Sequence, residues 1–416
     1  MRPRASGSVP PVIAMGSGVT LTAVLRLLHR SSIPAFAVSP DKDFSSHSRW
    51  HRVLPGSEHL RPSDLKNWLD HLELDGAVLL PCADDWVAAT AALPAETACR
   101  FPSSVATLGV IETLVDKWKF ARLLQQERLP HPDTRLLNSL EELESLPDSA
   151  FQQYILKPLS SVAFSQKYGV KGFMIHNRED ARRAMQHVPF PIMLQEFIPG
   201  PPTAGYFVEG FIDRNGRTCA MFARRRLRMY PRPLGNSTFM QSVPLNAVAG
   251  AVAPLQYLLE SLSYRGVFSA EFKYDARDGF FKLLEINARP WWYIEVPAEA
   301  GIDICRMAYL DALGLDIEPA LTYKAGHRFG YPFADLRAWR ELQKAEGLDF
   351  WSWLASWGGA SVTPFAWNDP MPAFAFGWQQ LSEYFRHKRA LQSVETEAKA
   401  GQNARDLVQD QDLARR

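Results

Sequence analysis

The sequence predicts a multidomain protein of mixed α/β and α+β class, and three observations carry that prediction. Its 416 residues leave room for two or three domains. Strand and helix patterns alternate as β-α-β-α-β over roughly the first 110 residues, which is typical of a small doubly wound α/β domain. Two β-hairpin patterns follow, and from about residue 320 aromatic residues interspersed with Pro and Gly become frequent. We therefore expect domains at 1–110 and 111–320 and an aromatic-rich extension at 321–416.

Composition and charge describe an ordinary globular protein. Hydrophobic residues make up 46% of the chain, charged residues make up 22%, and the formal net charge is +1. This balance gives no electrostatic reason to expect nucleic acid or an anionic membrane as the main partner. No run of eighteen apolar residues is present, so no membrane span is expected. The cysteines form no C-x-x-C motif, which favours reduced thiols and a cytoplasmic location; they are Cys82, Cys99, Cys219 and Cys305.

The first predicted domain carries an incomplete nucleotide fingerprint. Its expected elements are strands over 11–15, 33–38 and 76–80 and helices over 20–29 and 62–72. The first turn has Gly16 and Gly18 but Leu21, so the dinucleotide pattern G-x-G-x-x-G is broken. A nicotinamide-dependent oxidoreductase is therefore disfavoured but stays an alternative. The loops 44–48 and 81–86 at the strand ends either bind a ligand or simply cap the strands.

Between residues 115 and 200, the chain has three segments of chemical interest. Asp116 and Lys117 open a helix that ends near Gln126. A strand over 154–157 ends in Lys157 and leads into a loop with Ser, Gly and Lys, which suits either closure over a polyphosphate or an ordinary polar surface. The apolar strand over 191–197 offers edge backbone groups to a planar base.

The next hairpin pairs 207–212 with 218–226 and carries three arginines. Strand alternation puts Arg224, Arg226 and Arg228 on one face. Three cations on one face repel one another unless they meet anions or water. Both a solvated basic edge and contacts with phosphates fit this pattern, and Arg226 is the preferred phosphate contact.

The hairpin over 267–290 carries the strongest chemical signal. Folding about Asp278 places Glu271 opposite Glu285, Lys273 opposite Leu283, and Asp275 opposite Phe281. Two carboxylates across a ladder repel each other, so a cation should lie between them.

The residues that follow Glu285 extend this signal. Glu285, Asn287 and Arg289 share a face, and carboxylate and amide oxygens are ligands that Mg²⁺ accepts. Arg289 comes one step later, where its guanidinium could clamp a phosphoryl or carboxylate oxygen. The pattern therefore favours a metal–phosphate site over an exposed hairpin whose charges face water.

The motif E-F-K-x-D, followed by a turn and L-L-E-I-N-A-R-P, resembles the metal-binding end of the ATP-grasp ligases. It is similar in particular to the carboxylate–amine ligase branch of the D-aspartate ligase type. The resemblance implies an ATP-grasp fold over 111–320 with a lid subdomain near 125–195. It also implies that a Rossmann-like pre-ATP-grasp domain precedes this fold and helps to bind a non-nucleotide substrate.

The resemblance also assigns roles to residues. It implies two Mg²⁺ ions, with Mn²⁺ as an alternative, that are bridged by Glu285 and completed by Glu271 and Asn287. It implies that ATP phosphates meet Lys117, Lys157 and Lys171, and that adenine meets Glu196 and the main chain near Phe197 and Ile198. Glu209 is the candidate for the ribose contact, while Arg289 and Arg226 would stabilise the charge of the reacting groups.

The implied activity is that of an ATP-dependent ligase. A carboxylate would form an acyl phosphate, and an amine would then displace phosphate to give an amide. Small-molecule acids and amines are thus the expected partners, with a homodimer as a further expectation. A non-catalytic ATP-binding or scaffold protein stays an alternative. The region beyond 320 is expected to wrap onto the core or to offer an aromatic binding face, with a helix over 379–387 and a frayed polar tail after Ser393.

Overall fold

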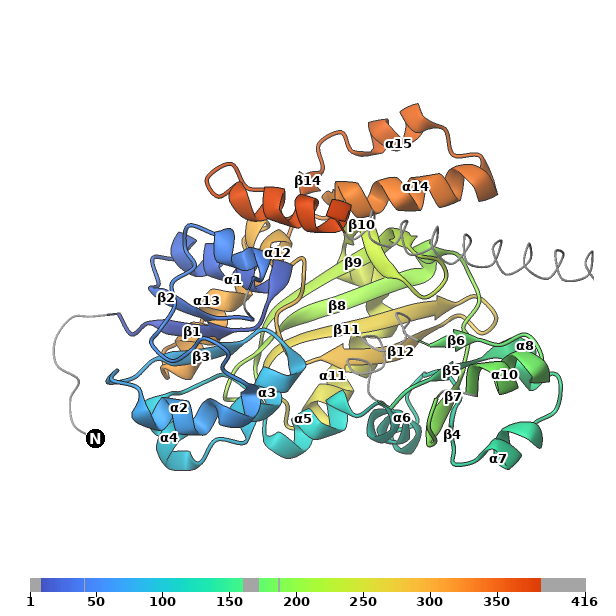
Figure 1. The fold of residues 1–416 in the computed structure, drawn as a ribbon, viewed down its shortest axis with the longest axis horizontal. Helices are drawn as coiled ribbons and strands as arrows, with labels where there is room; N and C mark the ends of the chain where they lie inside the picture. Colours follow the sequence, from blue (N-terminus) through green and yellow to red (C-terminus); the bar gives the residue numbers. More distant parts are fainter. Residues whose placement is uncertain (1–8, 41, 160–171, 186–187, 383–416) are drawn as a thin grey trace, which may run out of the picture.

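The computed structural model describes residues 9–40, 42–159, 172–185 and 188–382. Its strands form three sheets, of three, seven and four strands (Figure 1). The seven-stranded sheet lies in the middle of the view, with the three-stranded sheet and the four-stranded sheet on either side of it. Within the described ranges, no helix combines the length and hydropathy that crossing a bilayer requires.

The three-stranded sheet is parallel and is built by the first hundred residues. Strand β1 (Val12–Met15) lies between β2 (Ala35–Val38) and β3 (Val78–Pro81), and all three lie where the sequence predicts strands. Parallel neighbours need crossover connections. These contain helices and 3₁₀ turns, namely α1 (Gly18–Arg30), η1 (Phe44–His47), η2 (Pro62–Asp64) and α2 (Leu65–His71), while α3 (Asp84–Ala91) and α4 (Ala95–Arg100) follow β3.

The turn between β1 and α1 requires a glycine at position 16. Gly16 has a φ of +154°, and a Cβ there would lie 2.8 Å from the Cβ of Cys82. Any larger residue would push the turn away from β3. The Gly-rich turn is thus explained by close packing of backbone against β3, with no dinucleotide needed.

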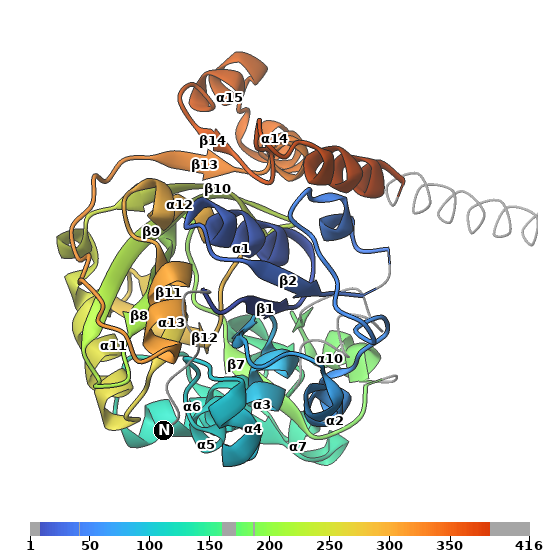
Figure 2. The same cartoon turned by 90° about the vertical axis from the view of Figure 1, so that its left-hand side faces the viewer.

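Helix α1 is buried along most of its length because the chain returns to it after the large sheet. Helices α12 (Glu295–Glu299) and α13 (Ile304–Ala312) pack against α1, and Figure 2 shows them beside it. One hydrophobic core joins Leu21 of α1 to Phe211 of the large sheet and Cys305 of α13. The packing is therefore continuous across the predicted boundary at residue 110.

The four-stranded sheet forms a smaller unit with its own core. Its order is β4-β7-β5-β6, and all pairings are antiparallel. Phe151, Leu156 and Ile192 lie in its core. The strands are β4 (Thr134–Leu137), β5 (Tyr154–Lys157), β6 (Phe173–Met174) and β7 (Ile192–Glu196). The helices of this part of the chain are α5 (Leu108–Val115), α6 (Lys117–Gln126), α7 (Leu140–Glu144), α8 (Ala150–Gln153) and α10 (Arg178–Met185).

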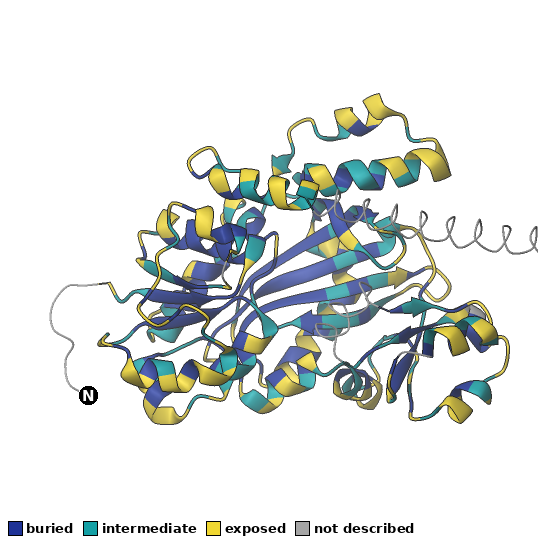
Figure 3. Ribbon diagram, in the orientation of Figure 1, coloured by how far each residue is buried: buried dark blue, intermediate teal, exposed yellow. Residues whose placement is uncertain are grey.

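The seven-stranded sheet has two differently covered faces. Helix α11 packs on one face against Phe268 and Phe272, whereas Phe207 and Phe222 face the core shared with the first sheet. Its inner strands are buried along most of their length (Figure 3). The order is β12-β11-β8-β9-β10-β13-β14. The strands are β8 (Gly205–Ile212), β9 (Thr218–Tyr230), β10 (Asn236–Val243), β11 (Gly266–Asp275), β12 (Phe280–Asn287), β13 (Arg328–Gly330) and β14 (Ser361–Val362). The 3₁₀ turn η3 (Pro202–Ala204) precedes β8, and η4 (Leu245–Val248) and α11 (Ala249–Ser261) lie between β10 and β11.

The β11–β12 hairpin forms where it is predicted, but with one irregularity. Glu271 pairs with Glu285 as expected, whereas Lys273 pairs with Lys282. The register shifts just after Glu271, which leaves Leu284 as the extra residue of a β-bulge. The predicted pairings of Lys273 with Leu283 and of Asp275 with Phe281 are therefore wrong by one position.

The chain beyond residue 320 packs on the large sheet through buried polar contacts. Asp335 is fully buried and accepts hydrogen bonds from Arg228, Thr238, Trp353 and Trp357. These bonds fix helices α14 (Pro332–Glu346) and α15 (Phe350–Ser356) to β9 and β10. A further helical stretch covers 371–382; the rest of the predicted 379–387 helix and the polar tail lie outside the described residues.

Candidate nucleotide and metal site

The centre of the site is the hairpin that carries two opposed carboxylates. Glu271 of β11 faces Glu285 of β12, and both are half-buried. The side-chain amide of Asn287 donates to Glu285 Oε1 over 3.2 Å, so these three side chains lie on one face as predicted. Within the described ranges, no group of three or more His, Cys, Asp or Glu could hold a metal. Two carboxylates and one amide oxygen fit Mg²⁺ if water or phosphate oxygens complete its shell.

One cation beside these carboxylates is a protein side chain, the guanidinium of Arg226. Arg226 Nη2 lies 2.8 Å from Glu271 Oε1, and Arg226 Nε donates to Ser237 Oγ over 2.8 Å. Arg226 is 9% exposed, so its charge is poorly screened by water. The structure therefore places Arg226 beside the β11–β12 hairpin that carries Glu271, Glu285 and Asn287, the candidate metal ligands (the metal hairpin).

The three arginines of β9 share a face as expected, but the interpretation as a solvated basic edge is wrong. Each is buried against a different carboxylate. Arg224 pairs with Glu209, Arg226 with Glu271, and Arg228 with Asp335. Buried charges are costly unless they are paired. Each of these arginines can be buried because an acid on a neighbouring element pairs with it.

The predicted ribose contact of Glu209 is wrong for this structure. Glu209 is fully buried, and its Oε1 accepts hydrogen bonds from Arg224 Nε over 2.8 Å and from Ser269 Oγ over 3.0 Å. Burial raises the pKa of Glu209, while Arg224 opposes that rise. A carboxylate enclosed in this way holds strands β8, β9 and β11 together and has no access to a ribose hydroxyl.

Arg289 lies at the junction between the hairpin and the first sheet. Its Nε lies 2.6 Å from Asp84 Oδ1, and its Nη2 donates to Asn287 Oδ1 over 3.2 Å. Burial opposes the charge of Arg289, but the facing carboxylate of Asp84 outweighs it and raises the arginine pKa. Asp84 was not singled out from the sequence, although it lies in the loop over 81–86, for which ligand binding and strand capping were both open.

The predicted phosphate-binding lysines come from separate elements. Lys117 begins helix α6, whose N-cap Asp116 accepts the backbone N–H groups of Trp118 and Lys119. Lys157 ends β5 and donates to Gln195 Oε1 over 2.7 Å. Lys171 lies outside the described residues, as does most of the predicted lid loop.

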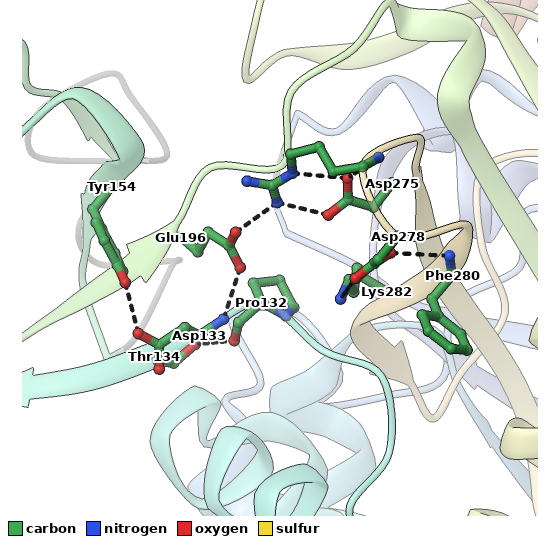
Figure 4. Close-up of polar contacts among 10 residues, drawn as sticks. Pro132, Asp133, Thr134, Tyr154, Glu196, Asp275, Asp278, Phe280 and Lys282 are labelled. Atoms are coloured by element: carbon green, nitrogen blue, oxygen red, sulfur yellow. Dashed lines mark hydrogen bonds and ion pairs between the residues drawn. The ribbon is translucent and has the colours of Figure 1, made fainter. Parts of the chain in front are cut away.

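The strand predicted to meet adenine ends in a side chain that already has partners. Glu196 Oε1 lies 2.6 Å from Arg277 Nη2, and Glu196 Oε2 accepts the backbone N–H of Asp133 over 3.1 Å. Figure 4 shows Glu196 between Asp133 of the four-stranded sheet and Asp275 of the hairpin. The N–H of Phe197 donates to the carbonyl of Gln153 over 2.7 Å. The carboxylate of Glu196 thus ties the four-stranded sheet to the hairpin turn.

Sequence reasoning missed Lys273, which joins the hairpin to the strand end. Its Nζ lies 5.3 Å from the ring centre of Phe197 and 3.4 Å from the carbonyl oxygen of Gly200. Burial, followed by the nearby charge of Arg226, lowers the pKa of Lys273. Its spacing of two residues from Glu271 was the signal, because strand alternation puts both on one face.

Comparison with known proteins places this arrangement in a known fold. No family model matches the sequence. The D-aspartate ligase of Enterococcus faecium (strain Aus0004) is 23% identical over 227 residues, which cover 51% of this chain and 53% of that protein. The chain thus matches about half the length of this curated relative.

Solved structures match a larger share of the chain. The L-amino acid ligase from Bacillus licheniformis superposes with a TM-score of 0.54 and 17% identity, covering 74% of this chain and 75% of that one. The ADP complex of purK, N5-carboxyaminoimidazole ribonucleotide synthetase, gives a TM-score of 0.60 and 14% identity over 75% and 79%. The biotin carboxylase domain dimer of the Hydrogenobacter thermophilus 2-oxoglutarate carboxylase, with MgADP, ADP and bicarbonate, gives 0.59 and 14% over 77% and 74%. The chain therefore has the fold of these ligases.

Proposed function

We propose that the protein is an ATP-dependent carboxylate–amine ligase that forms an amide or peptide-like bond and releases ADP and phosphate. The observation that carries this proposal is the opposed pair Glu271 and Glu285 with Asn287 beside them, flanked by Arg226 and Arg289, in an ATP-grasp fold. The similarity to a D-aspartate ligase supports the choice of carboxylate and amine as substrates.

The residues of this site fit ATP with Mg²⁺, and Mn²⁺ suits the same oxygen ligands. In the proposal, Glu271, Glu285 and Asn287 hold the metal, which when bound neutralises phosphate charge. Lys117, Lys157 and Lys171 meet the phosphates. The main chain from Glu196 to Ile198 meets adenine. The carboxylate of Glu196 takes no part in this contact, because it is paired with Arg277.

The chain's own groups position the reacting atoms. Ser237 and Glu271 hold the Arg226 guanidinium at the edge of the metal site, where it can stabilise charge on a transferring phosphoryl group. Asp84 holds Arg289 in place, so a substrate carboxylate can lie between the hairpin and the first sheet. The amine then attacks an acyl phosphate, and no protein nucleophile is required.

The proposal also assigns the parts of the chain. Residues 1–110 form a Rossmann-like pre-ATP-grasp domain, 111–320 the ATP-grasp domain with its lid near 125–195, and 321–416 the extension. A cytoplasmic location belongs to the proposal as well. So does a homodimer, which is supported by the dimer described for the biotin carboxylase neighbour.

The test is ADP release from ATP and Mg²⁺ against a matrix of amino acids, dicarboxylic acids and hydroxy acids paired with amines. We expect ADP release that requires both an acid and an amine, and a product mass equal to their sum less one water. Glu285→Gln should abolish this release. ADP release that is independent of every acid and amine, or none from any pair, would contradict a ligase.

A further inference from the structure

A large cavity lies away from the metal hairpin, between the first sheet and the C-terminal extension. Its volume is about 1430 Å³, which exceeds that of most small-molecule sites. It is lined by the loop over 42–47, the first half of α14 and residues from 362 to 382. Figures 1 and 2 show the extension lying over α1 at this place. No residue of the β11–β12 hairpin lines it, so it is separate from the proposed metal site.

Beside this cavity, a buried ion pair fastens the C-terminal extension to α1. Arg26 of α1 is 3% exposed and Asp369 of the extension is 2% exposed. Arg26 Nε lies 3.0 Å from Asp369 Oδ2, and Arg26 Nη1 donates to the Pro364 carbonyl over 2.8 Å. Ser48, next to the 42–47 loop, donates to the same Asp369 oxygen over 2.8 Å. These contacts fix the extension, including the lining residue Pro364, to the first part of the chain.

The lining of the cavity is mostly apolar, and part of it is exposed to water. Phe374 is 64% exposed and Trp378 is 74% exposed, although both are large apolar side chains. Other aromatic lining residues are Phe44, Phe333, Phe365 and Phe376. Concentrated exposed apolar surface in a concave site is typical of a place where an apolar ligand binds.

The charged lining residues that the structure describes are all cationic. They are Lys42, Arg337 and Arg340, and no Asp or Glu is among the described lining residues. Within the described ranges, Lys42 and Arg340 form no ion pair. A ligand with an anionic group would complement this positive charge.

We propose that this cavity binds an amphipathic organic anion, a carboxylic acid with a large alkyl or aromatic body. The aromatic lining takes the apolar body, and Lys42 and Arg340 attract the carboxylate. The ligand site is separate from the nucleotide site, so the proposal stands whether or not the protein is a ligase.

The test uses the full chain and two probes, the fluorescent anion 8-anilinonaphthalene-1-sulfonate and the acid dodecanoate. We expect the fluorescent probe to bind one site and dodecanoate to displace it. Arg340→Glu, at an exposed position, should weaken both by about tenfold, because it replaces attraction by repulsion of the same charge. Ala375→Trp should narrow the cavity and weaken the binding of both probes. Trp351→Ala, which removes an exposed apolar side chain outside the cavity, is the matched control.

Three results would overturn the proposal. Equal binding of both probes to the wild type and Arg340→Glu would show that the cations of the cavity play no part. An equal loss in Trp351→Ala would point to general surface binding. A dimer that excludes the fluorescent probe and dissociates in Arg340→Glu would assign the cavity to a second copy of the chain. Because these readouts need no ATP, their failure is distinct from a failure of the ligase assay.

Discussion

Arg226 sets the charge balance of the metal hairpin. Without it, Glu271 and Glu285 would place two negative charges opposite each other across the β11–β12 ladder. Its ion pair with Glu271 is 2.8 Å long and mostly shielded from water. In the proposed function, the same guanidinium stabilises charge on the transferring phosphoryl group.

Arg226→Met should therefore lower the rate of ADP release by about a hundredfold, which is typical for loss of a group that stabilises developing charge. The matched control is Arg225→Met. Arg225 is the next residue of β9, points to the opposite face and donates to the carbonyl of Thr203. Steady-state kinetics measure both variants, and an equal loss of rate in the two would contradict a role specific to Arg226.

Glu209 has a structural role in this account. Glu209→Gln leaves Arg224 buried without a counter-charge, so we expect the free energy of unfolding to fall by about 3 kcal/mol. The KM for ATP should stay near the wild-type value, because the side chain has no access to nucleotide. Urea unfolding and ATP saturation curves measure the two effects. An increased KM for ATP with unchanged stability would instead support a contact between Glu209 and the ribose.

The sequence predicted the members of the metal hairpin but not their long-range partners. Strand alternation and the hairpin turn are local rules, and they were enough to place Glu271, Glu285 and Asn287 on one face. Arg289 meets Asp84, which lies 205 residues earlier in the chain. No local pattern specifies such a contact, because it depends on how the first sheet packs against the hairpin.

At the scale of elements, strand register was the least predictable feature. The bulge at Leu284 shifts every pairing between Phe272 and the turn by one residue, while Glu271 and Glu285 stay opposed. A bulge re-aims side chains near a site without changing the composition of the strand. The sequence pattern of alternating residues therefore fitted both registers.

A chain of polar contacts links the four-stranded sheet to the hairpin turn. Tyr154 donates to Asp133 Oδ2 over 2.7 Å, and Asp133 donates its N–H to Glu196. Arg277 then bridges Glu196 and Asp275, with a distance of 2.6 Å to each. Figure 4 shows Tyr154, Asp133, Glu196 and Asp275 in this order. These contacts fix the angle between the sheet that carries Lys157 and the hairpin.

This chain of contacts predicts a pH dependence of stability. Hydrogen bonds from Arg277 hold the pKa of Asp275 below its usual value of 3.8. A lowered carboxyl pKa contributes stability above the unfolded-state pKa, and the contribution is lost as pH falls through the folded-state pKa. Arg277→Met should therefore be less stable than the wild type by up to about 1 kcal/mol at pH 6, since Arg277 is 47% exposed.

The difference between Arg277→Met and the wild type should shrink below about pH 4. Urea midpoints at pH 6 and pH 3 measure this change. Arg183→Met is the control, because Arg183 forms an exposed pair with Glu179 on α10 and should show a small difference at both values. A stability difference for Arg277→Met that is the same at pH 6 and pH 3 would rule out the linkage to Asp275.

At the scale of the whole molecule, the three sheets are joined by a chain that crosses back on itself. After the hairpin, α12 and α13 return to α1, so the first segment and the large sheet share one core. The alternation of strands and helices was predictable from local patterns. The return of α12 and α13 to α1 was not predictable from local patterns, because it depends on packing between residues far apart in the sequence, such as Leu21 and Cys305 in the shared core.

The packing of the C-terminal extension was likewise not predictable from local patterns in the sequence. Its aromatic residues were visible in the sequence, and both packing on the core and a binding face were open. The structure shows that Asp335 and Asp369 anchor it through Arg228 and Arg26. No local pattern in the sequence singles out these acids, since their partners lie more than a hundred residues away.

The central claim is that Glu271, Glu285 and Asn287 hold a metal that bridges to nucleotide. The most direct measurement is the affinity for ADP by titration calorimetry, with and without Mg²⁺, in the wild type, Glu285→Gln and Asp278→Asn. Asp278 is the control, because it is an exposed carboxylate at the turn of the same hairpin. We expect Mg²⁺ to strengthen ADP binding by roughly tenfold, or about 1.4 kcal/mol, in the wild type and Asp278→Asn. Glu285→Gln should bind ADP without that gain, and a gain as large as that of the wild type would contradict the account.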